Sequence, residues 1–169
     1  MKLIITGGAG FIGTNYVYHA VEAHKDYEIV VIDKVTYSGN RSSLAPLGSR
    51  VQFVEAHICD AARVSDAIDG ADFVVHFAAE SHVTRSEIDP DLFCLTNVLG
   101  TQTLLDAAHR ERIKRFVRIS TDEVYGPVPE GVFVRRPTGL RGILRLRART
   151  RRAKLSQTIS CKPIEIACP

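Results

Sequence analysis

A run of hydroxyl and carboxyl side chains directly follows an apolar stretch near residue 120. The stretch at 115–119 has the pattern of a strand, and the run that follows it is Ser120-Thr121-Asp122-Glu123. In open α/β sheets the carboxyl ends of the strands face the ligand crevice. Adjacent acids in different surroundings can divide general-acid and general-base work between them. We therefore expect chemistry here, with the alternative that Thr121 and Asp122 only cap a turn and the following helix.

Three glycines near the N-terminus have the spacing of a phosphate-binding loop. Gly7, Gly10 and Gly13 lie between an apolar strand at 2–6 and an amphipathic helix expected at about 14–24. Without side chains, such a loop lets a pyrophosphate approach the backbone, and the next helix directs its amide groups at the phosphates. Glycines alone are a weak signal, and an ordinary strand–helix turn is the alternative. Strand, spacing and helix together indicate a dinucleotide site.

An acid ends the second expected strand. This strand covers 27–32, and Asp33 follows it twenty positions beyond Gly13. A carboxylate at this place accepts hydrogen bonds from the adenosine ribose hydroxyls and repels a 2′-phosphate. The sequence therefore predicts NAD as the cofactor in preference to NADP.

The remaining elements alternate along the chain. Further strand patterns lie at 51–55, 72–77 and 116–120, and helical patterns at about 60–68 and 89–111. Asp60 suits a helix N-cap and Gly70 a helix stop. The apolar runs are nearly continuous, as in strands covered by helices on both faces. We predict an α/β fold, a Rossmann-type doubly wound parallel sheet truncated after about the fifth strand, with an uncovered edge and apolar face.

Residues 1–131 resemble the dTDP-glucose 4,6-dehydratase family of the extended short-chain dehydrogenase/reductases, within the NAD-dependent epimerases and dehydratases. The resemblance is carried by the glycine loop and by the segments at 33–40, 78–83, 97–101 and 120–126. The Thr-Asp-Glu triplet is its most specific part, because related sugar-nucleotide epimerases lack the adjacent acids. The resemblance implies an incomplete NAD-binding domain at 1–131, a nucleotide-sugar substrate and a homodimer for the full-length family.

The resemblance also implies a reaction and a site. Carbon C4 of the sugar is oxidised by hydride transfer to NAD, water is eliminated across C5 and C6, and the hydride returns to C6. Asp122 would protonate the departing C6 hydroxyl and Glu123 would take the C5 proton, which the 4-keto group acidifies. Ser81 and Thr121 would touch the sugar. Besides the glycine loop, the NAD site would be lined by Phe11, Ile12, Asp33, Lys34, Val35, Thr36, Ile58, Phe77, Ala78, Ala79, Glu80, Ser81 and Thr96.

Two residues depart from the family pattern. His57 and Thr84 stand where aspartates are usual, and the first of these aspartates usually contacts the adenine amino group. A neutral histidine can still accept a hydrogen bond, so we expect weakened cofactor binding at most. We interpret His57 as a structural or solvent-facing residue, and His76, inside an expected strand, as a satisfied core residue.

The composition changes after Gly131. Residues 132–169 hold ten Lys and Arg against one acid, and residues 1–131 hold twelve against eighteen, so that charges of +9 and −6 give the net +3. The family's Tyr-x-x-x-Lys motif, the base for the C4 hydroxyl, is missing. Codons permitted for 148–155 encode such a segment when read two bases out of phase. We therefore interpret 132–169 as a frameshifted, poorly ordered tail and the chain as a truncated, inactive form.

Several alternatives remain open. The chain could be a non-catalytic NAD-binding module, or an epimerase or dehydratase acting on another nucleotide sugar, such as a CDP- or GDP-sugar. Nucleic-acid binding by the tail is less favoured, because no aromatic residues interleave its arginines. The four cysteines and the histidines lack metal-ligand spacing, which predicts free thiols and no metal. No signal peptide or stretch of membrane-spanning length is present, which predicts a cytoplasmic protein with no membrane contact.

Overall fold

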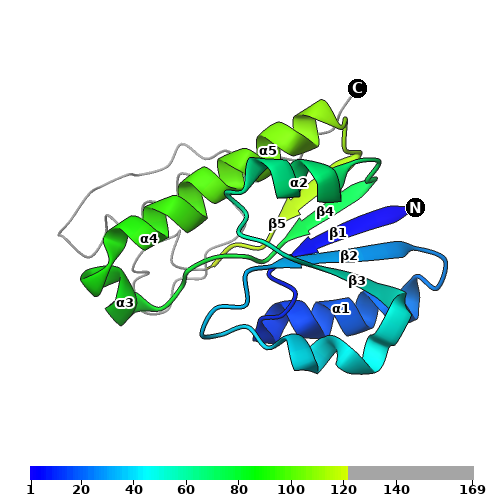
Figure 1. The fold of residues 1–169 in the computed structure, drawn as a ribbon, viewed down its shortest axis with the longest axis horizontal. Coiled ribbons are helices and arrows are strands. Elements are labelled where there is room, and N and C mark those ends of the chain that lie inside the picture. The colour runs from blue at the N-terminus through cyan, green and yellow to red at the C-terminus, as the bar shows by residue number, and fades with distance from the viewer. Residues whose placement is uncertain (122–169) are drawn as a thin grey trace, which may run out of the picture.

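The computed structural model describes residues 1–121, which form a five-stranded parallel sheet (Figure 1). The strand order is β3-β2-β1-β4-β5. The strands are β1 (Lys2–Thr6), β2 (Glu28–Asp33), β3 (Val51–Glu55), β4 (Phe73–His76) and β5 (Arg115–Arg118). The chain adds β2 and β3 on one side of the central β1 and then crosses over to add β4 and β5 on the other side, as in a Rossmann-type sheet. The predicted fold class is confirmed.

Helical segments connect the strands. They are α1 (Phe11–Ala23), the 3₁₀ segment η1 (Arg41–Arg50), α2 (Ala61–Ile68), α3 (Val83–Ile88), α4 (Pro90–Cys94), the π-helical segment η2 (Leu95–Gly100) and α5 (Thr101–Arg110). Figure 1 shows α1 and η1 on one face of the sheet and α2 and α5 on the other. Among these helices of residues 1–121, none is long and apolar enough to cross a membrane.

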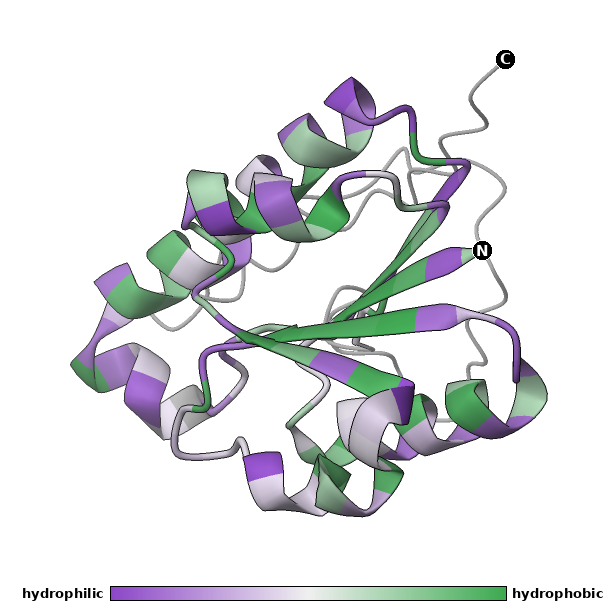
Figure 2. Cartoon of the chain, turned by 45° about the vertical axis from the view of Figure 1, so that its right-hand side comes forward, coloured by the Kyte–Doolittle hydropathy of each residue, from purple (hydrophilic) through white to green (hydrophobic). Residues whose placement is uncertain are grey.

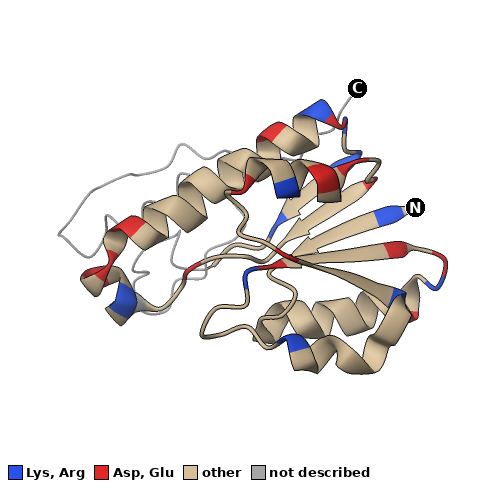
Figure 3. Ribbon diagram, in the orientation of Figure 1, with Lys and Arg blue, Asp and Glu red and all other residues tan. Residues whose placement is uncertain are grey.

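Alternate residues of each strand build two separate cores. Toward α2 and α5, Ile4 and Val30 pack with Leu104 of α5. Toward α1, Ile5 and Val31 pack with residues of that helix. Figure 2 shows the inner strands apolar along most of their length, and Figure 3 shows the charges of β1 and β2 at the strand ends. This pattern is what burial on both faces of a parallel sheet requires.

The predicted strands agree with the observed ones to within two residues, and the predicted helical stretch near the C-terminal end of the described residues contains an unpredicted π-helical turn. Asp60 does cap α2, accepting a hydrogen bond from the Arg63 amide at 3.1 Å, and Gly70 has a positive φ of 66°. The stretch predicted as helical at 89–111 is helical from Pro90 to Arg110, with the π-helical segment η2 joining α4 to α5. At Gly100, the last residue of η2, a Cβ would lie 2.5 Å from Ile58, so only glycine fits there.

One flank of the sheet carries apolar side chains near β5. A groove there is lined by Tyr16, Phe73, Val75 and Val117 among others. Val117 and Ile119 are 39% and 42% exposed. Within residues 1–121, these partly exposed side chains are in line with the predicted apolar face. The predicted tail at 132–169 lies outside the described residues.

A buried polar network joins the carboxyl ends of β1 and β4 to α5. Thr101 donates its one hydroxyl hydrogen to the Asn97 carbonyl at 2.9 Å, so its oxygen must accept from His76 Nε2, 3.1 Å away. Nδ1 of His76 therefore accepts from the Thr6 hydroxyl at 2.6 Å. Arg118 also donates to the Thr101 hydroxyl. His76 is thus the satisfied core residue that the sequence predicts.

This network makes stability depend on pH. Complete burial, with a contribution from Arg118, lowers the pKa of His76 to about 3. The unfolded chain binds this proton near pH 6.5, so the stabilisation is full above that pH and is lost as the pH falls toward 3. Between pH 7.5 and pH 5.0, urea unfolding should show a loss of about 2 kcal/mol from this group.

The variant His76→Gln is the control. It should be less stable at pH 7.5 and should lose this part of the pH dependence. An unchanged pH dependence in the variant would show that another group is responsible.

Candidate dinucleotide-binding site

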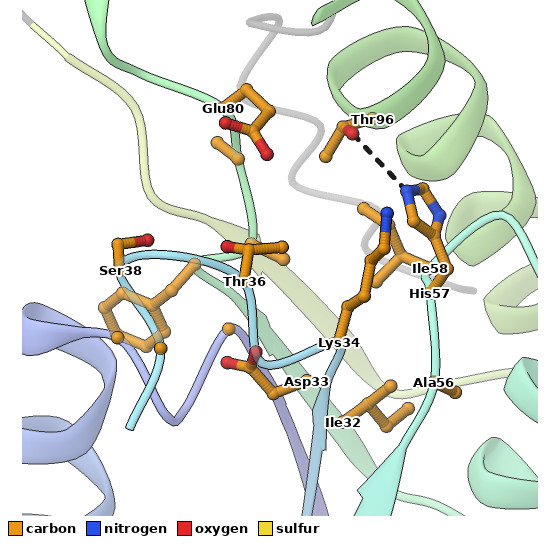
Figure 4. Close-up of a pocket in the computed structure, with 16 residues that line it drawn as sticks. Ile32, Asp33, Lys34, Thr36, Ser38, Ala56, His57, Ile58, Glu80 and Thr96 are labelled. Atoms are coloured by element: carbon orange, nitrogen blue, oxygen red, sulfur yellow. Dashed lines mark hydrogen bonds between the residues drawn. The ribbon is translucent and has the colours of Figure 1, made fainter. Parts of the chain in front are cut away.

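A cleft opens over the carboxyl ends of the strands (Figure 4). Its volume is about 590 Å³ with its solvent-open mouth included. It lies where strand order changes direction in the sheet, which is where open α/β sheets bind ligands. The cleft is lined by Gly7, Gly10, Ile32, Asp33, Lys34, Thr36, Ser38, Gly39, Ala56, His57, Ile58, Phe77, Ala78, Ala79, Glu80 and Thr96.

The glycine loop between β1 and α1 has no room for side chains at Gly7 and Gly13. Gly7 has a φ of +73°, and a Cβ there would lie 2.5 Å from the Ala78 nitrogen. A Cβ on Gly13 would lie 2.1 Å from the Gly7 carbonyl oxygen. Gly10 caps α1 without any side-chain hydrogen bond. The first-turn amides of α1, which have no partners within the helix, are therefore open to an anion at the positive end of the helix dipole.

Asp33 joins this loop to the loop after β2. Its Oδ2 accepts from the Ala9 amide at 2.9 Å, and its Oδ1 accepts from the Val35 amide at 2.8 Å. Val35 has a φ of +54°, which is unfavourable for a β-branched residue. The hydrogen bond to Asp33 helps to hold it there. Carboxylate oxygens have further lone pairs, so Asp33 can still accept from ribose hydroxyls.

The opposite wall of the cleft is held by Asn97. This residue lies in η2, and its side chain accepts from the Glu80 amide and donates to the Glu80 carbonyl, both at 2.8 Å. Tyr37 donates to the Glu80 carboxylate at 3.3 Å. The π-helical turn lets neighbouring Thr96 line the cleft while Asn97 holds the loop. Such turns occur frequently at functional sites.

His57 lines the cleft beyond the end of β3. Its Nδ1 accepts from the Cys59 amide at 3.0 Å, and its Nε2 lies 3.5 Å from the Thr96 hydroxyl. Burial and the Lys34 ammonium lower the pKa of His57, with Glu80 opposing them. The expected structural role of His57 agrees with the Cys59 bond, but the side chain also forms part of the cleft wall.

The cleft brings together most of the residues predicted for the cofactor. Gly7, Gly10 and Asp33 lie on its wall, as do Lys34, Thr36, Ile58, Phe77, Ala78, Ala79, Glu80 and Thr96. Gly13 lies behind it against Gly7.

Other predicted residues lie outside the cleft wall. Phe11 and Ile12, in the first turn of α1, are 85% and 64% exposed. Ser81 is also exposed, and Val35 contributes its amide to Asp33. Thr121 is exposed after β5, while Asp122 and Glu123 lie outside the described residues.

Some lining residues have no counterpart among the predicted ones. Ile32, Ala56 and His57 line the cleft at or after the ends of β2 and β3. The rule that places ligands at the carboxyl ends of strands was sufficient to find them. Asn97 positions Glu80 by hydrogen-bonding its backbone, and no sequence pattern signals that contact.

The tight packing of the glycine loop gives a stability test. Gly13→Ala should lower the free energy of unfolding by more than about 2 kcal/mol, because the new methyl group meets backbone that has no space to move. Gly70→Ala is the control, because a Cβ there meets nothing within 4 Å and the substitution carries only the cost of the positive φ of Gly70. It should cost only about 1 kcal/mol. Equal losses in denaturant unfolding would contradict the packing argument.

Comparisons with known proteins agree with this geometry. The model of the NAD dependent epimerase/dehydratase family matches residues 3–142. The dTDP-glucose 4,6-dehydratase of Streptomyces niveus is 48% identical over 139 residues, which are 79% of this chain and 41% of that protein. The dTDP-glucose 4,6-dehydratase of Mycobacterium tuberculosis strain H37Rv is 50% identical over 126 residues, 75% of this chain and 38% of that protein.

Solved structures of such enzymes share the fold. DesIV, a dTDP-glucose 4,6-dehydratase from Streptomyces venezuelae crystallised with NAD, has a TM-score of 0.73 at 45% identity, covering 79% of this chain and 43% of that one. The UDP-glucose 4-epimerase of Thermotoga maritima has a TM-score of 0.68 at 31% identity, covering 79% of this chain and 41% of that one. The chain thus spans about two fifths of the length of these relatives. With the family model matching most of its residues and the glycine loop and Asp33 in place, the chain belongs to the NAD dependent epimerase/dehydratase family.

Proposed function

We propose that this chain is the NAD-binding part of a dTDP-glucose 4,6-dehydratase. The observation that carries the proposal is the joined arrangement of the glycine loop, the open first turn of α1 and the Asp33 carboxylate around one cleft. The dehydratases among its relatives, at about 50% identity, support the choice of reaction.

The residues present fit a dinucleotide. Side chains at Gly7 or Gly13 would meet backbone, so these two positions can take only glycine, and the loop brings its backbone close to the ligand. The first turn of α1 would hold the pyrophosphate, and Asp33 the adenosine ribose. Glu80, held by Asn97, would line the path toward the sugar. The chemistry that NAD supplies in such a site is acceptance and return of a hydride.

The sugar chemistry would depend on residues after β5. Thr121, at the carboxyl end of that strand, would contact the sugar, and Asp122 and Glu123 would act as acid and base in the elimination. This assignment rests on the Thr-Asp-Glu triplet and on the dehydratase relatives. A related epimerase is the second candidate, because UDP-glucose 4-epimerases share the fold. The adjacent acids favour the dehydratase.

Cofactor preference is the first test of the proposal. Calorimetric titration should show NAD bound at least tenfold more tightly than NADP, because the Asp33 carboxylate accepts from the ribose hydroxyls and repels a 2′-phosphate. Asp33→Ala should remove this preference. Asp33→Asn is the matched control, which keeps the shape and one amide contact but loses the charge, and should retain only part of it. Equal binding of NAD and NADP by the unaltered chain would refute the assignment.

The second test concerns turnover. The sequence has no Tyr-x-x-x-Lys, so no residue of that motif can take the proton of the C4 hydroxyl. Positioned proton transfer is typically worth about a hundredfold to ten-thousandfold in rate. We therefore expect the 169-residue chain to form no 4-keto-6-deoxy product from dTDP-glucose above background. A version whose reading frame is restored through the tyrosine segment should be active. Measurable product from the unaltered chain would contradict this account.

A further inference from the structure

We propose that Tyr37 retains the dinucleotide in the cleft. Together with Glu80 and Arg85 it forms a strap across the cleft mouth, and the dinucleotide enters and leaves only when the Tyr37 side chain swings out. The inference rests on the proposed dinucleotide site and adds to it residues that control how fast the cofactor exchanges.

The strap joins two loops that lie on opposite sides of the glycine loop. Tyr37 follows β2, whereas Glu80 and Arg85 follow β4. In the sheet, β1 lies between β2 and β4, and the glycine loop follows β1. A contact between the two flanking loops therefore spans the place where the pyrophosphate belongs. Figure 4 shows Glu80 across from Thr36 and Ser38, which belong to the loop after β2.

Two contacts make up the strap. The Tyr37 hydroxyl donates to Oε2 of Glu80 at 3.3 Å, which is longer and therefore weaker than most O–H···O bonds. The Arg85 guanidinium carbon lies 3.9 Å from the centre of the Tyr37 ring, within the range of a cation–π interaction. Burial and Glu80 raise the pKa of the Tyr37 hydroxyl, with Arg85 opposing them, so this group keeps its hydrogen and can donate at neutral pH.

The strap runs from the solvent into the cleft. Tyr37 is 52% exposed and Arg85 is also exposed, whereas Glu80 is buried and lines the cleft. Thr36 and Ser38, the residues on either side of Tyr37, line the cleft as well. The tyrosine therefore connects the two walls at their outer rim.

The backbone at both ends of the strap is held in place, so that opening falls to the side chains. Beyond Tyr37, the Asn40 amide donates to the Ala9 carbonyl at 2.8 Å. On the opposite wall, Asn97 holds the backbone of Glu80. Rotation of the Tyr37 side chain breaks the two strap contacts without any change in the backbone.

This arrangement controls the rates of binding more than the affinity. The strap contacts join protein groups to one another with and without the ligand, so they favour neither state. Only the open fraction of the protein admits or releases a dinucleotide, and loss of a strap contact raises that fraction. Association and dissociation should therefore both become faster while Kd stays nearly the same. A residue that contacts the ligand directly would instead change the dissociation rate and Kd together.

Three variants and a matched control separate the contacts. Tyr37→Phe removes the hydroxyl and keeps the ring, Arg85→Gln removes the charge over the ring, and Tyr37→Ala removes both contacts. Tyr18→Phe is the control, because the Tyr18 hydroxyl donates to the Ser43 carbonyl at 2.9 Å and neither residue lines the cleft.

The experiment is stopped-flow mixing of the full chain with NADH, followed by the fluorescence of the reduced nicotinamide, with excess NAD added to measure dissociation. Tyr37→Phe and Arg85→Gln should each raise both rate constants about threefold, and Tyr37→Ala about tenfold, with Kd changed by less than about twofold. Tyr18→Phe should leave both rate constants unchanged.

Three results would overturn the inference and leave the proposed function standing. One is unchanged rate constants in the Tyr37 variants, and another is faster dissociation with a matching loss of affinity, which would make Tyr37 a direct ligand contact. The third is equal acceleration in Tyr18→Phe, which would show a general loosening of the fold. Absence of NADH binding by the unaltered chain would overturn the proposed function together with this inference.

Discussion

The carboxylate of Asp33 holds together the two loops from which the cleft is built. Its two oxygens accept from the amides of Ala9 in the glycine loop and Val35 after β2. The register of β1 against β2 brings these loops side by side, with Thr6 opposite Ile32. Without the carboxylate, the Ala9 amide would lose its acceptor and Val35 would lose support for its positive φ. The same group is thus both a structural link and the candidate ribose ligand.

The far side of the cleft depends on a second set of polar contacts. Asn97 holds the backbone of Glu80 from η2, and Thr101, one turn later, joins His76 and Arg118 to the same helical stretch. Asn97, Thr101 and His76 are buried, so each needs its partner to offset the loss of water. The loop after β4, which contains Glu80, is therefore held in place by contacts from η2 and not by hydrogen bonds within the loop alone.

The sequence is sufficient to predict the sheet, because each strand is an apolar run bounded by a turn residue. It is also sufficient to predict Asp33 and the glycines, because their types and spacing follow from phosphate and ribose chemistry. It is not sufficient for η2, since no residue pattern marks the π-helical turn, whose Gly100 packs against Ile58 from a distant segment.

The role of His57 is likewise inaccessible to sequence alone. A histidine can donate or accept, and only the Cys59 amide decides which nitrogen does which. The structure shows that His57 does accept a hydrogen bond, from the Cys59 amide, while the expected effect on cofactor binding stays a prediction. Tertiary contacts of this kind are local in space but leave no pattern in residue types.

The most direct test of this account is a crystal structure of the chain with a bound dinucleotide. The account predicts a pyrophosphate at the first turn of α1, ribose hydroxyls within hydrogen-bond distance of Asp33 and the purine beside His57. A dinucleotide bound elsewhere, or a ribose that does not contact Asp33, would contradict it.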